Sequence, residues 1–195
     1  MSSTHTTLHL PQPDWLADWL MQPPPEPEDR ARMAEVVAIA RANVERGCGG
    51  PFAAAVYRLD GIERISAAVN TTILSHCSAA HAELQALGLA QQRLGRHTLE
   101  PLPCVLISSS APCTMCLGAI AWSGVRRFVF ATDRSDVEAI GFDEGPPTPD
   151  WRDELARRGI ETEGPLLRAD GLAVLQRYVE CGGPIYNGRS TRLQG

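Results

Sequence analysis

The stretches His81-Ala82-Glu83 and Pro112-Cys113-Thr114-Met115-Cys116 decide how this chain folds and what it can bind. Together they supply one imidazole and two thiolates. Catalytic zinc sites use three protein ligands and leave the fourth position to water. Glu83 follows His81 by two residues, so we expect its carboxylate to reach that water without ligating the ion. The two stretches therefore predict one zinc ion held by His81, Cys113 and Cys116, with Glu83 as the proton shuttle.

The spacing of the two cysteines predicts that both lie in the first turn of a helix. Pro112 suits the first helical position, which makes Ala111 the expected N-cap, and Cys113 and Cys116 would then share one face. Unpaired N–H groups and the positive end of the helix dipole favour thiolates there. His81 is expected at the start of a second helix.

Two other uses of these residues stay open at this point. A closed structural zinc site would need a fourth ligand, and His76, Cys77 and His97 are the candidates. A thioredoxin-like redox pair is another use of a Cys-x-x-Cys motif. That use leaves the His81-Ala82-Glu83 motif without an explanation.

Composition narrows the classes of protein further. The chain has 195 residues, 44% of them hydrophobic and 21% charged, which is typical of one soluble globular domain. It has neither a bilayer-spanning apolar run nor a secretory signal pattern, so we expect a cytoplasmic protein without a membrane partner. The net charge of −5 and the lack of clustered Lys and Arg argue against a nucleic-acid partner.

The pattern of apolar residues predicts an α/β protein. Residues 1–27 are polar and proline-rich and form an N-terminal extension, with an amphipathic turn at 15–20, and residues 28–195 form a single domain. Strands are expected over 52–58, 63–69, 104–109, 127–131 and 165–168. Helices are expected over 28–46, 79–94, 112–122, 135–140, 151–158 and 171–181. Strands alternating with helices indicate a sandwich with helices on both faces of the sheet.

Several longer blocks resemble a known family. These blocks are CSAAHAELQALGLAQ (77–91), APCTMCLGAIAWSGVRRFVFA (111–131) and EAIGFDEGP (138–146), and they resemble the cytidine-deaminase-like superfamily, most closely its bacterial guanine deaminase branch. GGPFAAAV (49–56) and IYNGR (185–189) are also similar to that branch. The resemblance implies a three-layer α/β/α sandwich with a mixed five-stranded sheet, a homodimer and one zinc per subunit. It also implies hydrolysis of guanine, a small purine, to xanthine and ammonia through a zinc-activated water.

The resemblance also implies roles for individual residues. It matches His81, Cys113 and Cys116 to the zinc ligands and Glu83 to the proton shuttle, and it adds Glu144 as a second catalytic acid at the substrate edge. The residues that it places around the purine are Phe52, Asn70, His81, Ala82, Trp122 and Tyr186. Tyr186 is expected to close the pocket of its own or of the neighbouring subunit.

One position departs from the pattern of the family. Many relatives have Glu directly before the Pro-Cys pair, where this chain has Ala111, so a carboxylate behind the metal ligands is missing. Ser110 is a partial substitute. Three alternatives to a guanine substrate also stay open: adenosine in tRNA, cytosine, or another aminated heterocycle such as an aminotriazine. A zinc module without catalysis is a further alternative.

Overall fold

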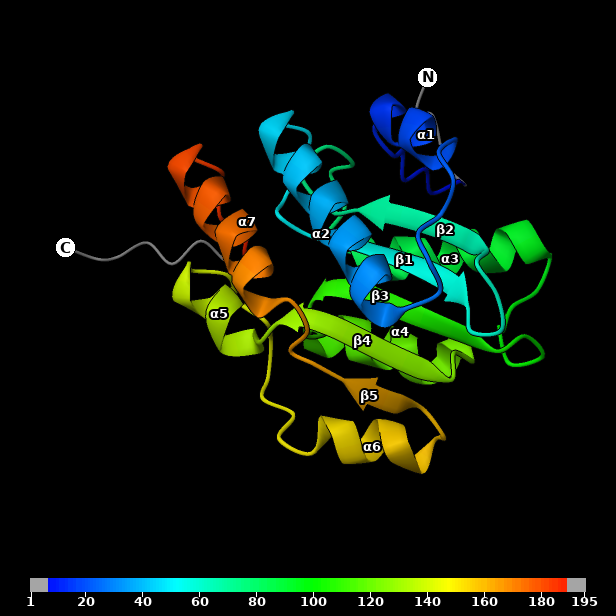
Figure 1. Ribbon diagram of the computed structural model, residues 1–195. Coiled ribbons are helices and arrows are strands. Elements are labelled where there is room, and N and C mark those ends of the chain that lie inside the picture. The colour runs from blue at the N-terminus through cyan, green and yellow to red at the C-terminus, as the bar shows by residue number, and fades with distance from the viewer. Residues whose placement is uncertain (1–6, 189–195) are drawn as a thin grey trace, which may run out of the picture.

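Five strands form one mixed sheet in the order β2-β1-β3-β4-β5 in the computed structural model, which describes residues 7–188 (Figure 1). β1 is antiparallel to both β2 and β3, whereas β3, β4 and β5 run parallel to one another. The strands are β1 (Ala53–Arg58), β2 (Arg64–Val69), β3 (Cys104–Ser110), β4 (Arg127–Thr132) and β5 (Glu161–Glu163). The predicted mixed five-stranded sheet is confirmed.

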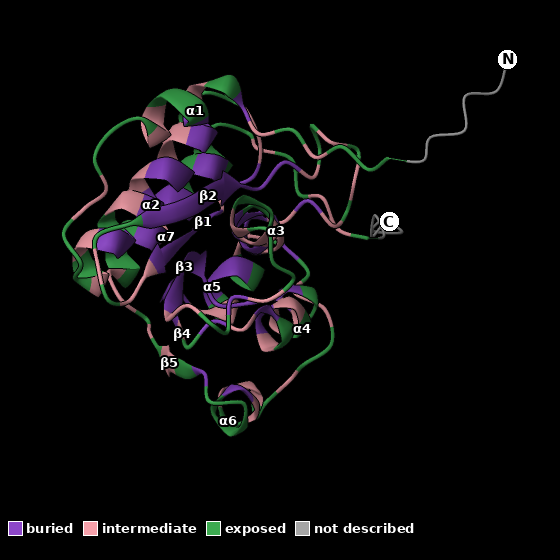
Figure 2. Ribbon diagram, turned by 90° about the vertical axis from the view of Figure 1, so that its right-hand side faces the viewer, coloured by how far each residue is buried: buried purple, intermediate pink, exposed green. Residues whose placement is uncertain are grey.

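Helices cover both faces of this sheet. One layer contains α1 (Asp14–Leu20), α2 (Asp29–Glu45), α5 (Arg134–Ala139) and α7 (Arg168–Glu180). The other contains α3 (Ala82–Leu94), α4 (Thr114–Ser123) and α6 (Trp151–Arg157). Figure 2 shows the buried sheet between the two helical layers. This arrangement confirms the predicted three-layer α/β/α sandwich.

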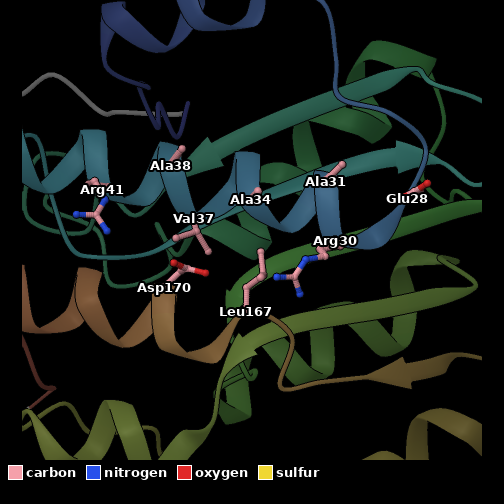
Figure 3. A pocket seen from close by; sticks show the side chains of 9 residues that line it. All are labelled: Glu28, Arg30, Ala31, Ala34, Val37, Ala38, Arg41, Leu167 and Asp170. Carbon is pink, nitrogen blue, oxygen red and sulfur yellow. The ribbon is translucent and has the colours of Figure 1, made fainter.

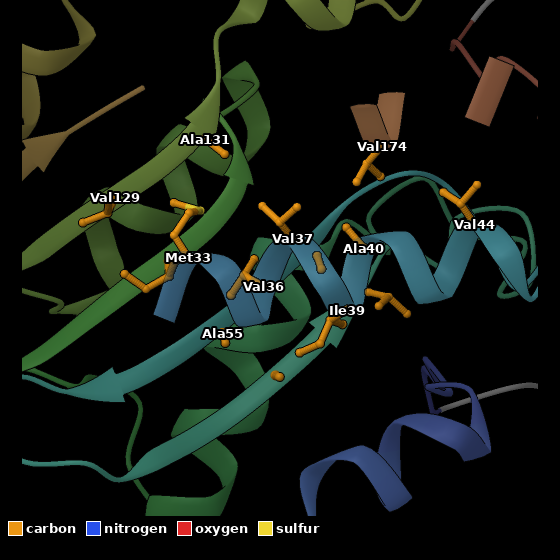
Figure 4. Packing of buried hydrophobic residues seen from close by; sticks show 14 of the residues in the cluster. Met33, Val36, Val37, Ile39, Ala40, Val44, Ala55, Val129, Ala131 and Val174 are labelled. Carbon is orange, nitrogen blue, oxygen red and sulfur yellow. The ribbon is translucent and has the colours of Figure 1, made fainter. Parts of the chain in front are cut away.

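Alternation along the strands builds two apolar cores, one on each face. In β1, Ala53, Ala55 and Tyr57 pack with the α2 layer, whereas Ala54 and Val56 pack with the α3 layer. Residues that alternate in a strand point to opposite faces, so a strand buried on both sides must be apolar throughout. Figure 4 shows α2 lying across the strands, with the side chains of Met33, Val36 and Ile39 on the side facing the strands and that of Val37 pointing toward Val174 of α7.

Three details of the predicted elements were wrong. α4 begins at Thr114, and its N-cap is Cys113 rather than Ala111, because Cys113 is extended and its sulfur accepts the Cys116 N–H. α3 begins at Ala82 rather than at residue 79, and His81 is its N-cap. The last strand is Glu161–Glu163 instead of 165–168, because the apolar pair Leu166 and Leu167 packs against the α2-side core just before α7 begins.

The N-terminal segment packs on the α2 side of the sandwich (Figure 1). Leu16 of α1 is 1% exposed and belongs to the same apolar core as α2. Residues 1–6 of the predicted extension, and Arg189 of the predicted IYNGR block, lie outside the described residues. Each helix within residues 7–188 is too short or too polar to cross a bilayer.

Candidate metal and active site

Three metal-ligating side chains meet at the N-termini of α3 and α4. His81 Nδ1 lies 3.5 Å from Cys113 Sγ and 3.6 Å from Cys116 Sγ, and the three ligand atoms lie within 4.8 Å of one another. Tetrahedral zinc, with Zn–N near 2.0 Å and Zn–S near 2.3 Å, requires N···S separations of about 3.5 Å. The side chains are therefore already spaced as zinc ligands, and the donor set of one nitrogen and two sulfurs suits this ion.

The two cysteines differ in acidity because each affects the pKa of the other. Hydrogen bonds from the Cys116 thiol and from His81 lower the pKa of Cys113 to about 4. The hydrogen bond to Cys113 and burial raise the pKa of Cys116. The Cys113 sulfur also accepts the backbone N–H of Cys116 at 3.5 Å. One ligand is thus already a thiolate, and a bound cation favours loss of the second proton.

The candidate fourth ligands of a closed zinc site lie elsewhere. Among residues 7–188, the metal-ligating cluster contains only His81, Cys113 and Cys116. His76 and His97 are exposed, and Cys77 belongs to no such cluster in this range. The described part of the chain therefore offers a three-ligand site, the arrangement that leaves a coordination position to solvent.

Glu83 lies beside the ligands and is buried, with 6% of its surface exposed. Its Oε2 is 3.4 Å from Cys116 Sγ, and its Oε1 accepts a hydrogen bond from Ser108 Oγ at 3.3 Å. Burial and then the neighbouring Cys113 thiolate raise the pKa of Glu83. A carboxylate with a raised pKa can both accept and return a proton near neutral pH.

A small cavity opens from the metal cluster and collects side chains that are distant in sequence. Its lining residues are Phe52, Asn70, His81, Glu83, Ser110, Ala111, Cys113, Phe142, Asp143, Glu144 and Tyr186. Phe52, Asn70, Glu144 and Tyr186, which the sequence assigned to a site only through the family resemblance, lie together here. Phe142 and Asp143 were not predicted, although both belong to the quoted block 138–146.

Aromatic rings and one amide form the wall of this cavity. Phe52 and Phe142 make an edge-to-face pair with centroids 5.3 Å apart, and Phe142 and Tyr186 make another at 4.9 Å. Asn70 is fixed in place because its N–H donates to Phe52 O at 2.9 Å and its Oδ1 accepts from Thr72 N–H at 3.1 Å. The wall thus combines flat aromatic surfaces with the oriented carboxamide of Asn70. A planar heterocycle can pack against the aromatic surfaces and hydrogen-bond to the carboxamide.

Glu144 faces the ligands from the loop between α5 and α6. Burial, followed by the nearby Cys113 thiolate and Glu83, raises the pKa of Glu144 to about 8. Its backbone carbonyl accepts the Thr114 N–H at 3.1 Å, so the loop is attached to the start of α4. At neutral pH in the protein without metal, this second carboxyl group is protonated and can donate a hydrogen bond.

Tyr186 closes the cavity from the C-terminal segment of the same chain. Its hydroxyl is buried and has no hydrogen-bond partner within the described part of the chain, and a Cβ added to Gly50 would lie 1.8 Å from that oxygen. The ring therefore depends on a glycine at position 50. The remaining space is about 40 Å³, room for a few water molecules only. This space is smaller than a purine, so a heterocyclic ligand requires the wall of the cavity to widen.

Comparison with known proteins agrees with this donor set. Residues 26–132 match the family model of the cytidine and deoxycytidylate deaminase zinc-binding region. The chain belongs to this deaminase family. Among curated relatives, the guanine deaminase of Bacillus subtilis (strain 168) is 35% identical over 112 residues, which cover 57% of this deaminase and 69% of that protein.

Solved structures match almost the whole deaminase. A guanine deaminase from Nitrosomonas europaea is 42% identical and superposes with a TM-score of 0.87 over 92% of this chain and 100% of that chain. A structure of NE0047 in complex with 2,6-diaminopurine is 44% identical, with a TM-score of 0.87 over 93% of this chain and 97% of that chain. The shared fold thus extends well beyond the metal motif.

Two residues assigned to the purine by resemblance do not line the cavity of the deaminase. Trp122 is 83% exposed because it lies on the outer face of α4. Ala82 is buried in the apolar core beneath α3 and α4. Ala111, where the family resemblance led us to expect Glu, lines the cavity, and the neighbouring Ser110 Oγ is buried with no hydrogen-bond partner among residues 7–188.

A wider groove of about 540 Å³ runs between α2 and the start of α7 (Figure 3). It is lined by apolar side chains and by charges of both signs, among them Arg30, Arg41 and Asp170, and none of the described residues that line it is Cys or His. This groove has the larger volume, but the smaller cavity is lined by two of the three candidate zinc ligands and by the carboxyl groups of Glu83 and Glu144. We therefore take the smaller cavity as the candidate active site.

Proposed function

We propose that this deaminase hydrolyses guanine to xanthine and ammonia. The observation that carries the proposal is that the His81, Cys113 and Cys116 cluster opens into a cavity lined by two carboxyl groups with raised pKa values. Deamination needs an activated water, a proton shuttle and a donor to the leaving amine, and these groups can supply all three. The similarity to guanine deaminases over almost the whole chain supports guanine as the substrate.

Zinc bound by the three ligands would supply the Lewis acid that lowers the pKa of a water molecule at the open position. Glu83 accepts the proton of the attacking water and delivers it to the ring nitrogen beside the carbon that carries the amine. A C–O bond forms at that carbon, and its C–N bond then breaks. Glu144 donates a proton to the departing amine, which leaves as ammonia, and regains a proton from the hydroxyl group on the carbon as the C=O bond forms.

Recognition of the base falls to the cavity wall. In this proposal, Asn70 hydrogen-bonds to the polar edge of the purine while Phe52 and Phe142 contact its faces. Tyr186, which closes the cavity in the structure, covers the bound base. Such closure excludes water from the reaction, which strengthens the electrostatic interactions inside.

We further propose that the deaminase is a homodimer in which α4 forms part of the interface. This helix, TMCLGAIAWS, is apolar on all sides, but only Cys116, Ile120 and Ser123 are buried. Met115, Gly118, Ala119 and Trp122 follow the i, i+3, i+4, i+7 spacing of one outer face. An apolar helix face beside the site fits a second copy related by twofold symmetry. A cytoplasmic location is part of the same proposal.

Ammonia release from a panel of substrates tests the function. Purified zinc-loaded protein is incubated separately with guanine, cytosine, an aminotriazine and a tRNA pool, and xanthine is followed by chromatography. Guanine should give equal amounts of ammonia and xanthine, with much slower release from the others. Ammonia release only from tRNA, or only from cytosine, would refute the proposal. Zinc binding without ammonia release from any substrate would identify a non-catalytic zinc module.

Substitution of Glu83 separates catalysis from metal binding. Glu83→Gln keeps the size of the side chain but can neither accept nor deliver the shuttled proton. We expect normal zinc content and a fall in kcat of at least about 1000-fold. Turnover at the wild-type rate would refute the role assigned to Glu83.

A further inference from the structure

Gln12, which precedes α1, hydrogen-bonds to the framework that carries the site. Its Oε1 accepts the backbone N–H of Val69 at 2.8 Å, and its Nε2 donates to Gln85 Oε1 at 2.7 Å. Val69 is the last residue of β2, which is an edge strand of the described sheet. Gln12 thus satisfies an edge N–H at the point where the chain leaves the sheet toward Asn70.

Gln85, buried on α3, connects this contact to the metal ligand. Its Nε2 donates to Val69 O at 3.0 Å and to Ala80 O at 2.9 Å, and it lies 3.1 Å from Thr71 Oγ1. Val69 and Thr71 flank Asn70, whereas Ala80 directly precedes His81. One carboxamide therefore joins the two chain segments that carry the Asn70 amide and the His81 imidazole.

The hydrogen bonds of Gln12, Gln85 and Val69 form a closed circuit. The Val69 N–H can only donate, so the oxygen of Gln12 must face it, and the amino group of Gln12 then faces Gln85. Val69 O and Ala80 O can only accept, so Gln85 turns its amino group toward them and its oxygen toward Gln12. Each backbone group thus fixes the orientation of one side chain, and each side chain fixes the other.

We propose that Gln12 is a positioning residue that acts through Gln85 on His81 and Asn70. In this proposal, the segment before α1 keeps the His81 imidazole and the Asn70 amide at a constant separation. The part of this inference that concerns substrate rests on the proposed function, whereas the part that concerns zinc does not. Groups behind metal ligands commonly change metal affinity or activity by 10- to 100-fold when they are removed.

Two substitutions at Gln12 test this role against a matched control in the same segment. Gln12→Ala removes both hydrogen bonds, whereas Gln12→Glu keeps the acceptor for Val69 but loses the donor to Gln85. The control is Trp19→Phe, which removes the hydrogen bond from Trp19 Nε1 to Glu35 and leaves the Gln12 circuit intact. All three variants weaken the attachment of the N-terminal segment. Only the two Gln12 variants remove hydrogen bonds that connect this segment to the candidate site.

The readouts are the zinc Kd, measured by competition with a chromogenic chelator, and kcat and KM for guanine. We expect both Gln12 variants to raise the zinc Kd and the KM for guanine by about tenfold. Trp19→Phe should change neither value, although it lowers the melting temperature. Unchanged zinc Kd and KM in Gln12→Ala, or equal changes in Trp19→Phe, would overturn the proposal. If the wild-type protein does not turn over guanine, the proposed function fails and the zinc Kd alone decides the role of Gln12.

Discussion

The backbone N–H of Thr114 donates to the carbonyl oxygen of Glu144 at 3.1 Å, which attaches the second acid of the site to the Cys-x-x-Cys turn. The Thr114 hydroxyl adds a bond to Pro146 O at 2.8 Å. Arg134 also donates to the carbonyls of Gly145 and Pro146 in the same loop. The metal ligands and the Glu144 loop are thus built as one unit, because a residue between the two cysteines holds the loop.

Thr114→Val should weaken catalysis without loss of metal. Valine keeps the backbone N–H but removes the hydroxyl that bonds to Pro146 O, a contact worth about 1 kcal/mol. We expect kcat/KM for guanine to fall about fivefold at unchanged zinc content, and Thr114→Ser to restore it. Steady-state kinetics with metal analysis measures both, and equal losses in the Val and Ser variants would contradict the prediction.

Gly50→Ala should disturb closure of the cavity. The new Cβ would lie 1.8 Å from the Tyr186 hydroxyl and 3.3 Å from Asn70 Oδ1, so the tyrosine must move. Overpacking of this kind costs about 1–3 kcal/mol, and we expect KM for guanine to rise about tenfold. Gly61→Ala is the matched control, since its Cβ would meet no atom of residues 7–188 within 4 Å. An unchanged KM in Gly50→Ala would show that Tyr186 does not cover the substrate.

Glu144 should make the zinc-free protein less stable as the pH rises. The folded state keeps the Glu144 proton up to a pKa of about 8, whereas the pKa of a free glutamate carboxyl group is 4.5. Between these values the native state binds more protons than the unfolded state, so the free energy of unfolding falls with rising pH. Glu144→Gln lacks this proton. Its stability relative to wild type should therefore rise by roughly 3 to 4 kcal/mol from pH 5 to pH 8 in urea unfolding. A difference that does not vary with pH would contradict the assigned environment.

Trp122→Ser should weaken the proposed dimer. Trp122 is 83% exposed on the outer face of α4, and a buried interface tryptophan commonly contributes 2 kcal/mol or more. Sedimentation should show a dimer dissociation constant raised by about 30-fold. Ile62→Ser is the control, because Ile62 is also an exposed apolar residue, at 59%, and lies in the turn between β1 and β2. Equal effects of the two substitutions would refute an interface at α4.

Much of this architecture could be predicted from local sequence patterns. The zinc ligands and Glu83 followed from residue types and spacing, since three N/S donors and a nearby acid leave few other uses. The four longer strands followed from short apolar runs. β5 was missed because Glu161, Thr162 and Glu163 are polar and half-exposed or exposed at the edge of the sheet. Ala111 was wrongly predicted as the N-cap of α4, because Pro112 suits the first helical position. The N-cap in the structure is Cys113, whose sulfur accepts the backbone N–H of Cys116.

The rest of the site depends on contacts between segments far apart in the chain. Phe52, Asn70, Glu144 and Tyr186 were assigned only by resemblance, because nothing in their local sequence distinguishes them from core, turn or surface residues. Phe142 was missed for the same reason. The bond between Gln12 and Gln85 spans 73 positions, and no periodicity in the sequence records it. Contacts between residues so far apart in the sequence can be identified only from the folded structure.

The central claim is that three side chains hold a zinc ion and leave its fourth position to solvent. Zinc-edge X-ray absorption, combined with metal analysis of the protein as isolated, tests this claim most directly. The account predicts one zinc per chain with two sulfur neighbours at about 2.3 Å and two nitrogen or oxygen neighbours at about 2.0 Å, one of which exchanges with added inhibitor. Protein without zinc, or a zinc ion with three or four sulfur neighbours, would contradict it.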